Sequence, residues 1–284
     1  MSDTTEKLQY KTFAFIGAGN LASALIKGLL ESGTSGKDIF VRNSSDESTN
    51  RKAELLGVSP GMSNLDIAQK ADVVVLAVKP QKMTMVLSEL GELNPQNKLF
   101  MSVAAGISCA QIENSVGTKL KTKEQTIRLV RAMPNTPALV KCGATGIARG
   151  TFATDADMSF CNELFEQLGV SVEVPERELD LVTGLSGSGP AYVMRFIEAM
   201  VSAAVSHGLD TEKATKLVSQ TVYGAAVLLR ETKETPKQLR EKVTSPGGTT
   251  MAGLSALDTH EFDRAIHAAI DAAKKRSIEL GETR

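Results

Sequence analysis

The sequence predicts an α/β fold in two parts, a parallel sheet covered by helices and then a region built only of helices. In the first part, short apolar runs rich in β-branched residues alternate with helix-length segments, as expected for strands joined by helical crossovers. From about residue 176 no such run occurs, and the segments have helical periodicity. Because 284 residues exceed the roughly 150 of a typical domain, we expect two domains, at residues 12–175 and 176–284.

The elements of the first domain follow from this alternation. Apolar strands separated by helical segments favour parallel pairing, with helices on both faces of the sheet. Strands are expected at residues 12–16, 38–43, 71–78, 98–103, 126–130, 145–149 and 171–174, and helices at 20–33, 47–57, 80–91 and 155–169.

The second domain is expected to be all helical, with helices at residues 179–208, 211–232, 235–243 and 261–280. The stretch VTSPGGTTMAGL, at 243–254, interrupts this pattern, because proline donates no backbone hydrogen bond and glycine is costly to order in a helix. We expect SPGG to end one helix and TTMAGLSAL to begin the next.

The composition argues against nucleic-acid, membrane and metal binding. Lysine and arginine total 32 and aspartate and glutamate 33, so a net charge of −1 gives no attraction to a polyanion or an anionic lipid surface. The most apolar run, VVVLAV at 73–78, is far shorter than a membrane-spanning helix. The three histidines and three cysteines lack metal-ligand spacing. We expect a small-molecule ligand and no metal.

The expected location is the cytoplasm. Cys109, Cys142 and Cys161 are odd in number and widely spaced, which argues against a disulfide framework. The opening MSDTTEKLQYK is polar and carries acidic residues, so it lacks both the apolar core of a secretion signal and the pattern of an organellar presequence.

The segment FAFIGAGNLASALIKGL, residues 13–29, has the pattern of a dinucleotide-binding turn. An apolar strand ends at Ile16, Gly17, Gly19 and Ala22 supply GxGxxA, and a helix follows at once. The glycines allow a tight turn and let backbone amides approach a pyrophosphate closely. The positive end of the helix dipole then attracts the negative charge of the pyrophosphate. This context predicts a Rossmann-type domain that binds a nicotinamide dinucleotide.

The loop after the second strand, VRNSSDES at 41–48, bears on which dinucleotide binds. NAD sites usually offer a carboxylate here to the ribose 2′-hydroxyl, whereas Arg42, Asn43 and Ser44 are donors. Arg42 could pair with a 2′-phosphate, which favours NADP over NAD. A solvated loop with an incidental arginine is the alternative, since Asp46 is close enough to reach a hydroxyl.

Three further loops are expected to follow strands at the same edge of the sheet. They are AVKP at 77–80, SVAAG at 102–106 and MPNTP at 133–137. Ligands of open α/β sheets bind at the carboxyl ends of strands, so these loops would form the rim of one crevice.

These motifs, in their order and spacing, resemble the pyrroline-5-carboxylate reductases, which make proline in the last step of its biosynthesis. The resemblance rests on FIGAGNLA, VVLAVKPQ, MPNTP, VTGLSGSGPAY and VTSPGGTT, and extends from about residue 12 to the carboxyl end. It implies hydride transfer from NADPH to the imine carbon of 1-pyrroline-5-carboxylate, with NADH open as a second reductant. It also implies a homodimer with interlocking C-terminal helices, often assembled into a larger ring.

The resemblance further implies two sets of site residues. The substrate loop would comprise Ser245, Gly247, Gly248, Thr249 and Thr250. The NADP(H) site would be lined by Ile16, Gly17, Ala18, Gly19, Asn20, Leu21, Arg42, Asn43, Asn64, Ala77, Val78, Lys79, Pro80, Ala104, Ala105 and Gly106.

The break at SPGG also has a physical interpretation. The amides of Gly248, Thr249 and Thr250 would be free at a helix N-terminus, which attracts the substrate carboxylate. The Thr250 hydroxyl is the side chain best placed to hydrogen-bond the ring nitrogen, as the resemblance also implies. Since a cyclic imine takes its proton from water, orientation matters most and no strong general acid is required. A purely structural Pro-Gly turn is the alternative.

Two other functions stay open as alternatives. A β-hydroxyacid dehydrogenase shares this domain order but uses a lysine in the first helix of the second domain, where GLSGSGPAYVMRFIEAM has none. Arg195 is no substitute, because its guanidinium does not release a proton near neutral pH. A non-catalytic NADP(H) sensor would not need the SPGGTT anion site.

Overall fold

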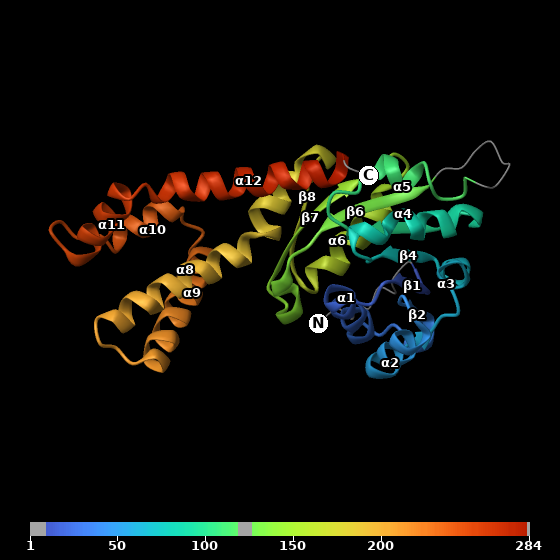
Figure 1. The fold of residues 1–284 in the computed structure, drawn as a ribbon, viewed down its shortest axis with the longest axis horizontal. Helices are drawn as coiled ribbons and strands as arrows, with labels where there is room; N and C mark the ends of the chain where they lie inside the picture. Colours follow the sequence, from blue (N-terminus) through green and yellow to red (C-terminus); the bar gives the residue numbers. More distant parts are fainter. Residues whose placement is uncertain (1–9, 119–126, 283–284) are drawn as a thin grey trace, which may run out of the picture. The chain divides into compact units, whose positions relative to one another are not determined.

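The computed structural model describes residues 10–118 and 127–282, and the chain divides into two compact units (Figure 1). The first unit comprises residues 1–187 and 273–284, and the second comprises residues 188–272. The first unit reaches past the expected limit at residue 175 because the next segment packs on the sheet. Leu179 in that segment is buried and lies against Gly146 of a strand.

The first unit is built on one eight-stranded sheet, and the expected α/β class is confirmed. The sheet order is β3-β2-β1-β4-β5-β6-β7-β8, with the strand order reversing next to β1 as in dinucleotide-binding folds. The strands are β1 (Phe13–Ile16), β2 (Ile39–Arg42), β3 (Ser59–Pro60), β4 (Val73–Leu76), β5 (Leu99–Ser102), β6 (Arg128–Met133), β7 (Gly143–Arg149) and β8 (Gly169–Glu173).

Helices cover both faces of this sheet, as expected. Because successive strand residues point to opposite faces, Phe13 and Phe15 enter one core while Ala14 and Ile16 enter the other. The first core is closed by residues of α1, α2 and α6, and the second by residues of α3, α4 and α5. These helices are α1 (Asn20–Glu31), α2 (Asp46–Leu56), α3 (Asn64–Lys70), α4 (Pro80–Glu89), α5 (Cys109–Glu113) and α6 (Asp155–Glu166).

The sheet departs from the expected all-parallel pairing at one place, since β7 runs antiparallel to β6. Only residues 134–142 connect the two strands, and a parallel pair needs a crossover of about a dozen residues or more. Three further elements were not expected from the sequence, namely β3, α3 and α5, which are two to seven residues long. Segments this short show too few turns for a periodic pattern to stand out.

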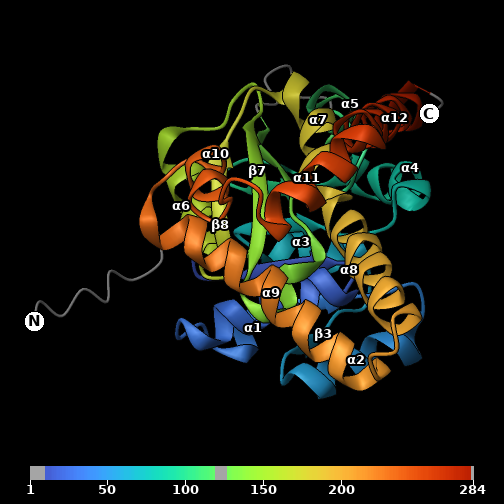
Figure 2. The same cartoon turned by 90° about the vertical axis from the view of Figure 1, so that its left-hand side faces the viewer.

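The second unit contains only helices, as expected. They are α8 (Gly189–Ser206), α9 (Thr211–Thr232), α10 (Pro236–Lys242), α11 (Thr249–Thr259) and the first part of α12 (Phe262–Glu282). Helices α8 and α9 pack against each other as a pair (Figure 2). None of the helices in residues 10–118 and 127–282 is long and apolar enough to cross a membrane.

The single helix expected at residues 179–208 is interrupted. It consists of α7 (Leu179–Val182), a π-helical turn at Thr183–Gly187, and α8. Pro190 lies in the first turn of α8, where its missing N–H does no harm, but it could not continue the α7 hydrogen bonding. Because π-helical turns are often found at functional sites, this interruption is a candidate part of the functional site.

Candidate active site

The turn after β1 is closed by a glycine that tolerates no side chain. Gly17 has a φ of 91°, and a Cβ there would lie 2.7 Å from the Ala77 carbonyl oxygen. The Gly17 N–H donates to the Arg42 carbonyl at 2.8 Å, and the Ala77 N–H donates to the Ile16 carbonyl at 2.9 Å. The turn therefore lies directly against the carboxyl ends of β2 and β4.

The N-terminus of α1 is left open. Its N-cap residue is Gly19, no described side chain caps it, and its first turn holds no acidic residue. A Cβ on Gly19 would have no described atom within 4 Å. Helix α2 differs, because Ser45 caps it and Asp46 and Glu47 fill its first turn. The first amides of α1 and the positive end of its dipole are thus available to an anion.

Asn43 holds the glycine turn in place. Its Oδ1 accepts the Ala18 N–H at 2.8 Å, and its Nδ2 donates to the Ser48 carbonyl at 3.2 Å. Its own N–H donates to the buried Thr49 hydroxyl at 3.0 Å. Asn43 therefore connects the turn to α2 through its side chain, and a direct cofactor contact for Asn43 stays a prediction.

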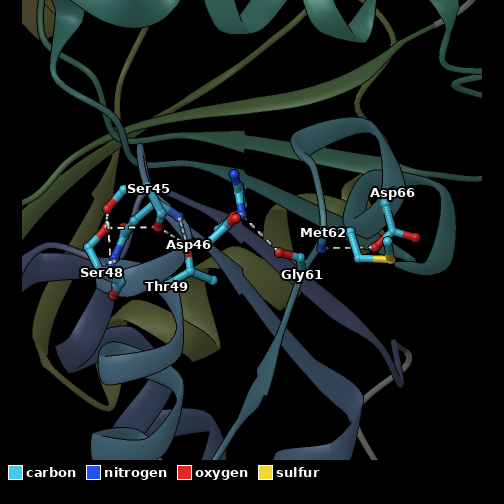
Figure 3. A network of polar contacts seen from close by, with 9 residues as sticks. Ser45, Asp46, Ser48, Thr49, Gly61, Met62 and Asp66 are labelled. Atoms are coloured by element: carbon cyan, nitrogen blue, oxygen red, sulfur yellow. Dashed lines mark hydrogen bonds and ion pairs between the residues drawn. The ribbon is translucent and has the colours of Figure 1, made fainter.

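Arg42 is held between two acceptors. Its guanidinium lies 2.5 Å from the Asp46 carboxylate and 3.3 Å from the Gly61 carbonyl oxygen. Figure 3 shows the polar contacts of this region, with Asp46 and Gly61 among the labelled residues. Asp46 is largely exposed, so the pair is weak and a phosphate could replace the carboxylate. Arg42 was expected at this loop from the sequence, but its pairing with Asp46 was not predicted.

The remaining predicted cofactor loops lie at the same edge of the sheet. Ile16 is level with Leu76 in the neighbouring strand, and Leu76 is level with Ser102. The loops 77–80 and 103–106 therefore leave the sheet side by side with the glycine turn. Lys79 and Pro80 form the N-cap and first residue of α4.

Asn64 is the first residue of α3. Its Nδ2 donates to the Glu89 carboxylate at 2.7 Å and so connects α3 with α4. A cofactor contact for Asn64 stays a prediction.

A small pocket joins the glycine turn to two other motifs. It has a volume of about 140 Å³ and is lined by Asn20, Leu21, Pro134, Asn135, Thr136, Leu139 and Gly187. Asn135 fixes its shape, because its Oδ1 accepts the Ala144 N–H at 2.9 Å and its Nδ2 donates to the Ser186 carbonyl at 3.0 Å. The loop MPNTP and the π-helical turn thus lie beside the start of α1.

The SPGGTT loop belongs to the second unit. Helix α10 ends at Lys242 and α11 begins at Thr249, as expected. Gly247 has a φ of 70°, which glycine adopts without strain. The N-cap is Gly248, no described side chain caps α11, and its first turn has no acidic residue.

One expectation for this loop is wrong. The Gly248 N–H is not free, because it donates to the Ser245 carbonyl at 3.0 Å and closes the turn. The amides available at the start of α11 are therefore those of Thr249 and Thr250, together with the next one along the helix.

Comparisons with known proteins decide the family. The family model of pyrroline-5-carboxylate reductase dimerisation matches residues 176–280, and that of NADP oxidoreductase, coenzyme F420-dependent, matches residues 12–106. Pyrroline-5-carboxylate reductase 2 of Bacillus subtilis is 39% identical over 276 residues, covering 96% of each chain. The enzyme of that name from Pisum sativum is 39% identical, covering 95% of this chain and 96% of its own. This chain belongs to the pyrroline-5-carboxylate reductase family.

Solved structures of this family agree with the fold. The pyrroline-5-carboxylate reductase of Coxiella burnetii is 36% identical, with a TM-score of 0.86 over 95% of this chain and 98% of that one. The pyrroline carboxylate reductase of Plasmodium falciparum, solved with NADP bound, is 29% identical, with a TM-score of 0.82 over 97% of this chain and 100% of that one. The resemblance inferred from the motifs is confirmed.

An ion pair between a buried arginine and a half-buried glutamate near the predicted cofactor loops was not foreseen from the sequence. Arg131 of β6 lies 3.1 Å from Glu176, whose carboxylate also accepts the Cys109 N–H at 2.6 Å. Burial, followed by the Glu176 charge, raises the pKa of the Cys109 thiol, so it stays uncharged. A charged residue in a central strand was the available signal, since such a residue is rarely buried without a partner.

The titratable side chains form no obvious metal site. Within residues 10–118 and 127–282, no group of three or more histidine, cysteine, aspartate or glutamate side chains lies close enough to hold an ion.

Proposed function

We propose that this member of the family reduces 1-pyrroline-5-carboxylate to proline with NADPH. The observation that carries the proposal is the open N-terminus of α11 directly after Gly247, in the segment matched by the family model. The free amides at this N-terminus suit a carboxylate. In the first unit, the uncapped start of α1 after the glycine turn suits the pyrophosphate of a dinucleotide in the same way. The relatives' printed names and the NADP bound in the Plasmodium falciparum structure support the same reaction.

The residues of the first unit fit NADPH. The uncapped start of α1 suits the pyrophosphate, and Gly17 and Gly19 leave the space that its approach needs. Asn20, Leu21 and Thr136 line the pocket that would take the nicotinamide half. Bound there, NADPH supplies the hydride for the imine carbon.

Arg42 would recognise the 2′-phosphate by exchanging its Asp46 partner for a phosphate oxygen. NADH lacks this phosphate, so it is expected to be the weaker reductant.

The residues of the second unit fit the substrate. The N–H groups of Thr249 and Thr250 would hold the ring carboxylate at the positive end of α11. The Thr250 hydroxyl would accept a hydrogen bond from the protonated ring nitrogen and fix the ring's orientation. Because water can protonate the imine, these residues need only bind and orient.

The test is a direct assay with both candidate substrates. Purified enzyme should oxidise NADPH, followed at its nicotinamide absorbance, when 1-pyrroline-5-carboxylate is added and should yield proline. A 3-hydroxy acid with NADP or NAD should give no turnover. Turnover of the 3-hydroxy acid alone would favour the dehydrogenase alternative, and NADPH binding without either reaction would favour the sensor.

The chain is further proposed to act as a homodimer through its second unit. A groove of about 520 Å³ there is lined almost wholly by apolar side chains, including Tyr192, Phe196, Met200, Phe262 and Ile266. Exposed apolar surface of this extent favours a second copy, and the family model for this segment describes dimerisation. Light scattering should give at least twice the mass of one chain, and a multiple of the dimer mass if rings form. A fully active monomer at micromolar concentration would disprove the dimer.

The proposed location is the cytoplasm. All three cysteines are free thiols, and Cys142 is exposed, which suits a reducing compartment. Cell fractionation with antibody detection should find the protein with cytoplasmic enzymes.

A further inference from the structure

The loop after β5 rests on the last turns of α12, with two glycines facing each other. Gly106 has a φ of 70°, and a Cβ there would lie 3.3 Å from the Gly281 nitrogen, the Leu280 Cβ and the Ser277 carbonyl oxygen. A Cβ on Gly281 would lie 3.0 Å from the Gly106 carbonyl oxygen. The two backbones therefore pack closely, and a methyl group on either glycine would push its neighbour aside by a few tenths of an ångström.

A hydrogen bond from a buried serine anchors this end of α12. Ser277 is 3% exposed, and its hydroxyl donates to the Asp180 carboxylate at 2.6 Å. Asp180 lies in α7, which packs on β6 and β7. Gln111 of α5 also donates to the Gly281 carbonyl, at 3.5 Å. The last turns of α12 are thus attached to the sheet on one side and to the loop on the other.

The other end of the same loop is fixed separately. The Cys109 N–H donates to Glu176, which the buried Arg131 pairs with from β6. Between these two attachments lies a cavity of about 300 Å³, lined by Gly106, Ser108, Gln111, Arg131, Asp180, Ser277, Ile278 and Gly281. Because side chains do not fill this space, close packing does not hold the loop, and its position depends on the polar and backbone contacts.

We propose that Ser277 and Asp180 are positioning residues for NADPH. Their hydrogen bond holds the end of α12 against Gly106 and so keeps residues 104–106 in the conformation that meets the cofactor. The inference rests on the proposed function, because residues 104–106 belong to its NADP(H) site. Neither residue belongs to the expected NADP(H) site, so their effect is on cofactor affinity and not on the hydride-transfer step itself.

The first experiment measures NADPH affinity by fluorescence titration without substrate, so no turnover is needed. Ser277→Ala and Asp180→Ala should each raise the Kd for NADPH about fivefold to tenfold, since each removes the hydrogen bond that holds α12 against the loop. Asp180→Asn keeps an acceptor oxygen and should change the Kd less than about twofold. Ser159→Ala, an exposed serine of α6, is the matched control and should change nothing.

Steady-state kinetics separate positioning from general damage. The KM for NADPH should rise in Ser277→Ala and Asp180→Ala, while the KM for 1-pyrroline-5-carboxylate stays within about twofold of the wild type. The double variant should be no worse than either single one, because both remove the same bond. Wild-type NADPH affinity in Ser277→Ala, or an Asp180→Asn variant as weak as Asp180→Ala, would overturn the proposal.

Gly281→Ala tests the same contact without loss of a hydrogen bond. Alanine favours a helix more than glycine, so α12 itself should be no less stable. The added methyl would nevertheless push on the Gly106 carbonyl, and the Kd for NADPH should rise severalfold. An unchanged Kd would overturn the proposal even if the other variants failed to fold. A wild type that binds NADPH but leaves 1-pyrroline-5-carboxylate unreduced would instead overturn only the proposed function.

Discussion

The two units bury their apolar residues very differently. In the first unit every residue of β1, β4 and β5 is buried, and two cores fill the space between sheet and helices. In residues 188–272, all of which the structure describes, only Ala214 and Val218 are buried. A sheet with helices on both faces encloses its side chains, whereas a pair of packed helices buries only the seam between them. The first unit therefore carries its own core, and the second needs a partner surface.

The largest expected effect comes from opening the core of the first unit. Phe100 of β5 is 0% exposed, so Phe100→Ala should lower the free energy of unfolding by about 3–5 kcal/mol at any protein concentration. Phe196 of α8 is 41% exposed, and Phe196→Ala should instead make the unfolding temperature depend more strongly on protein concentration. Thermal unfolding of both variants at two protein concentrations that differ about fiftyfold checks the two expectations. If both variants lost the same stability, independent of protein concentration, the proposed difference between the two units would be wrong.

The second prediction concerns the glycine that closes the loop of the second unit. A Cβ on Gly248 would lie 2.4 Å from the Ser245 hydroxyl and 3.1 Å from the Ser245 carbonyl oxygen, so Gly248→Val would displace the hydroxyl and crowd the backbone of the turn. Its φ of −81° is one that valine adopts, so crowding and not backbone strain is the cause. We expect kcat/KM for 1-pyrroline-5-carboxylate to fall more than about a hundredfold, with NADPH binding retained. Gly253→Ala in the same helix, where a Cβ has open space, should leave activity unchanged.

The third prediction concerns the hydroxyl at the start of α11. Thr250→Ala should lower kcat/KM about tenfold to a hundredfold, because a hydrogen bond to a charged partner contributes about 1.5–3 kcal/mol. Thr259→Ala, at the far end of the helix, removes a hydroxyl that bonds only the Ser255 carbonyl and serves as the control. Full activity of Thr250→Ala would rule out the proposed contact with the ring nitrogen.

The fourth prediction tests cofactor choice in the first unit. Arg42→Ala should raise the KM for NADPH about tenfold and that for NADH less than about twofold, since only NADPH carries the 2′-phosphate. Asp46→Asn should lower the KM for NADPH, because it removes the competing carboxylate at 2.5 Å. The control is Asp66→Asn, which breaks a pair with Lys70 instead. Equal effects of Arg42→Ala on both cofactors would exclude a phosphate role.

The smallest expected effect is a pH dependence of the first unit's stability. Burial alone would raise the pKa of Asp72, but the Lys11 N–H, the Thr12 side chain and N–H, and the Lys98 charge together hold it below its usual value. A lowered folded-state pKa gives stability that is present above about pH 4 and lost as the pH falls further. Asp72→Asn should therefore unfold with a smaller pH dependence between about pH 5 and pH 3, by about 1 kcal/mol or less. Chemical denaturation at both pH values measures it, and a wild-type pH dependence in Asp72→Asn would contradict the assignment.

Much of the architecture was determined by the sequence alone. The run from Phe13 to Ile16, the glycines at 17 and 19, and the break at Pro246 act through local backbone chemistry, so the sequence alone predicts them. The break before Pro190 was missed, because the helical pattern continues on both sides of it. The helix at 211–232 was predicted to the residue, because its apolar period is sustained over many turns and Asp210 caps it. The order of these motifs was also enough to indicate the family.

Only the tertiary structure decided which groups meet. The contact of Gly106 with Gly281 depends on segments that are far apart in the sequence and fold to one place. The antiparallel β7, the pairing of Arg42 with Asp46 and the engaged Gly248 amide are more local, but they depend on the backbone and side-chain conformations of their loops, which the sequence pattern does not report. Sequence periodicity indicates which face of a helix or strand is apolar, but it does not indicate which residue of another element that face contacts. Hydrogen bonds and ion pairs require distances near 3 Å, and such distances between remote residues are set by packing of the whole unit.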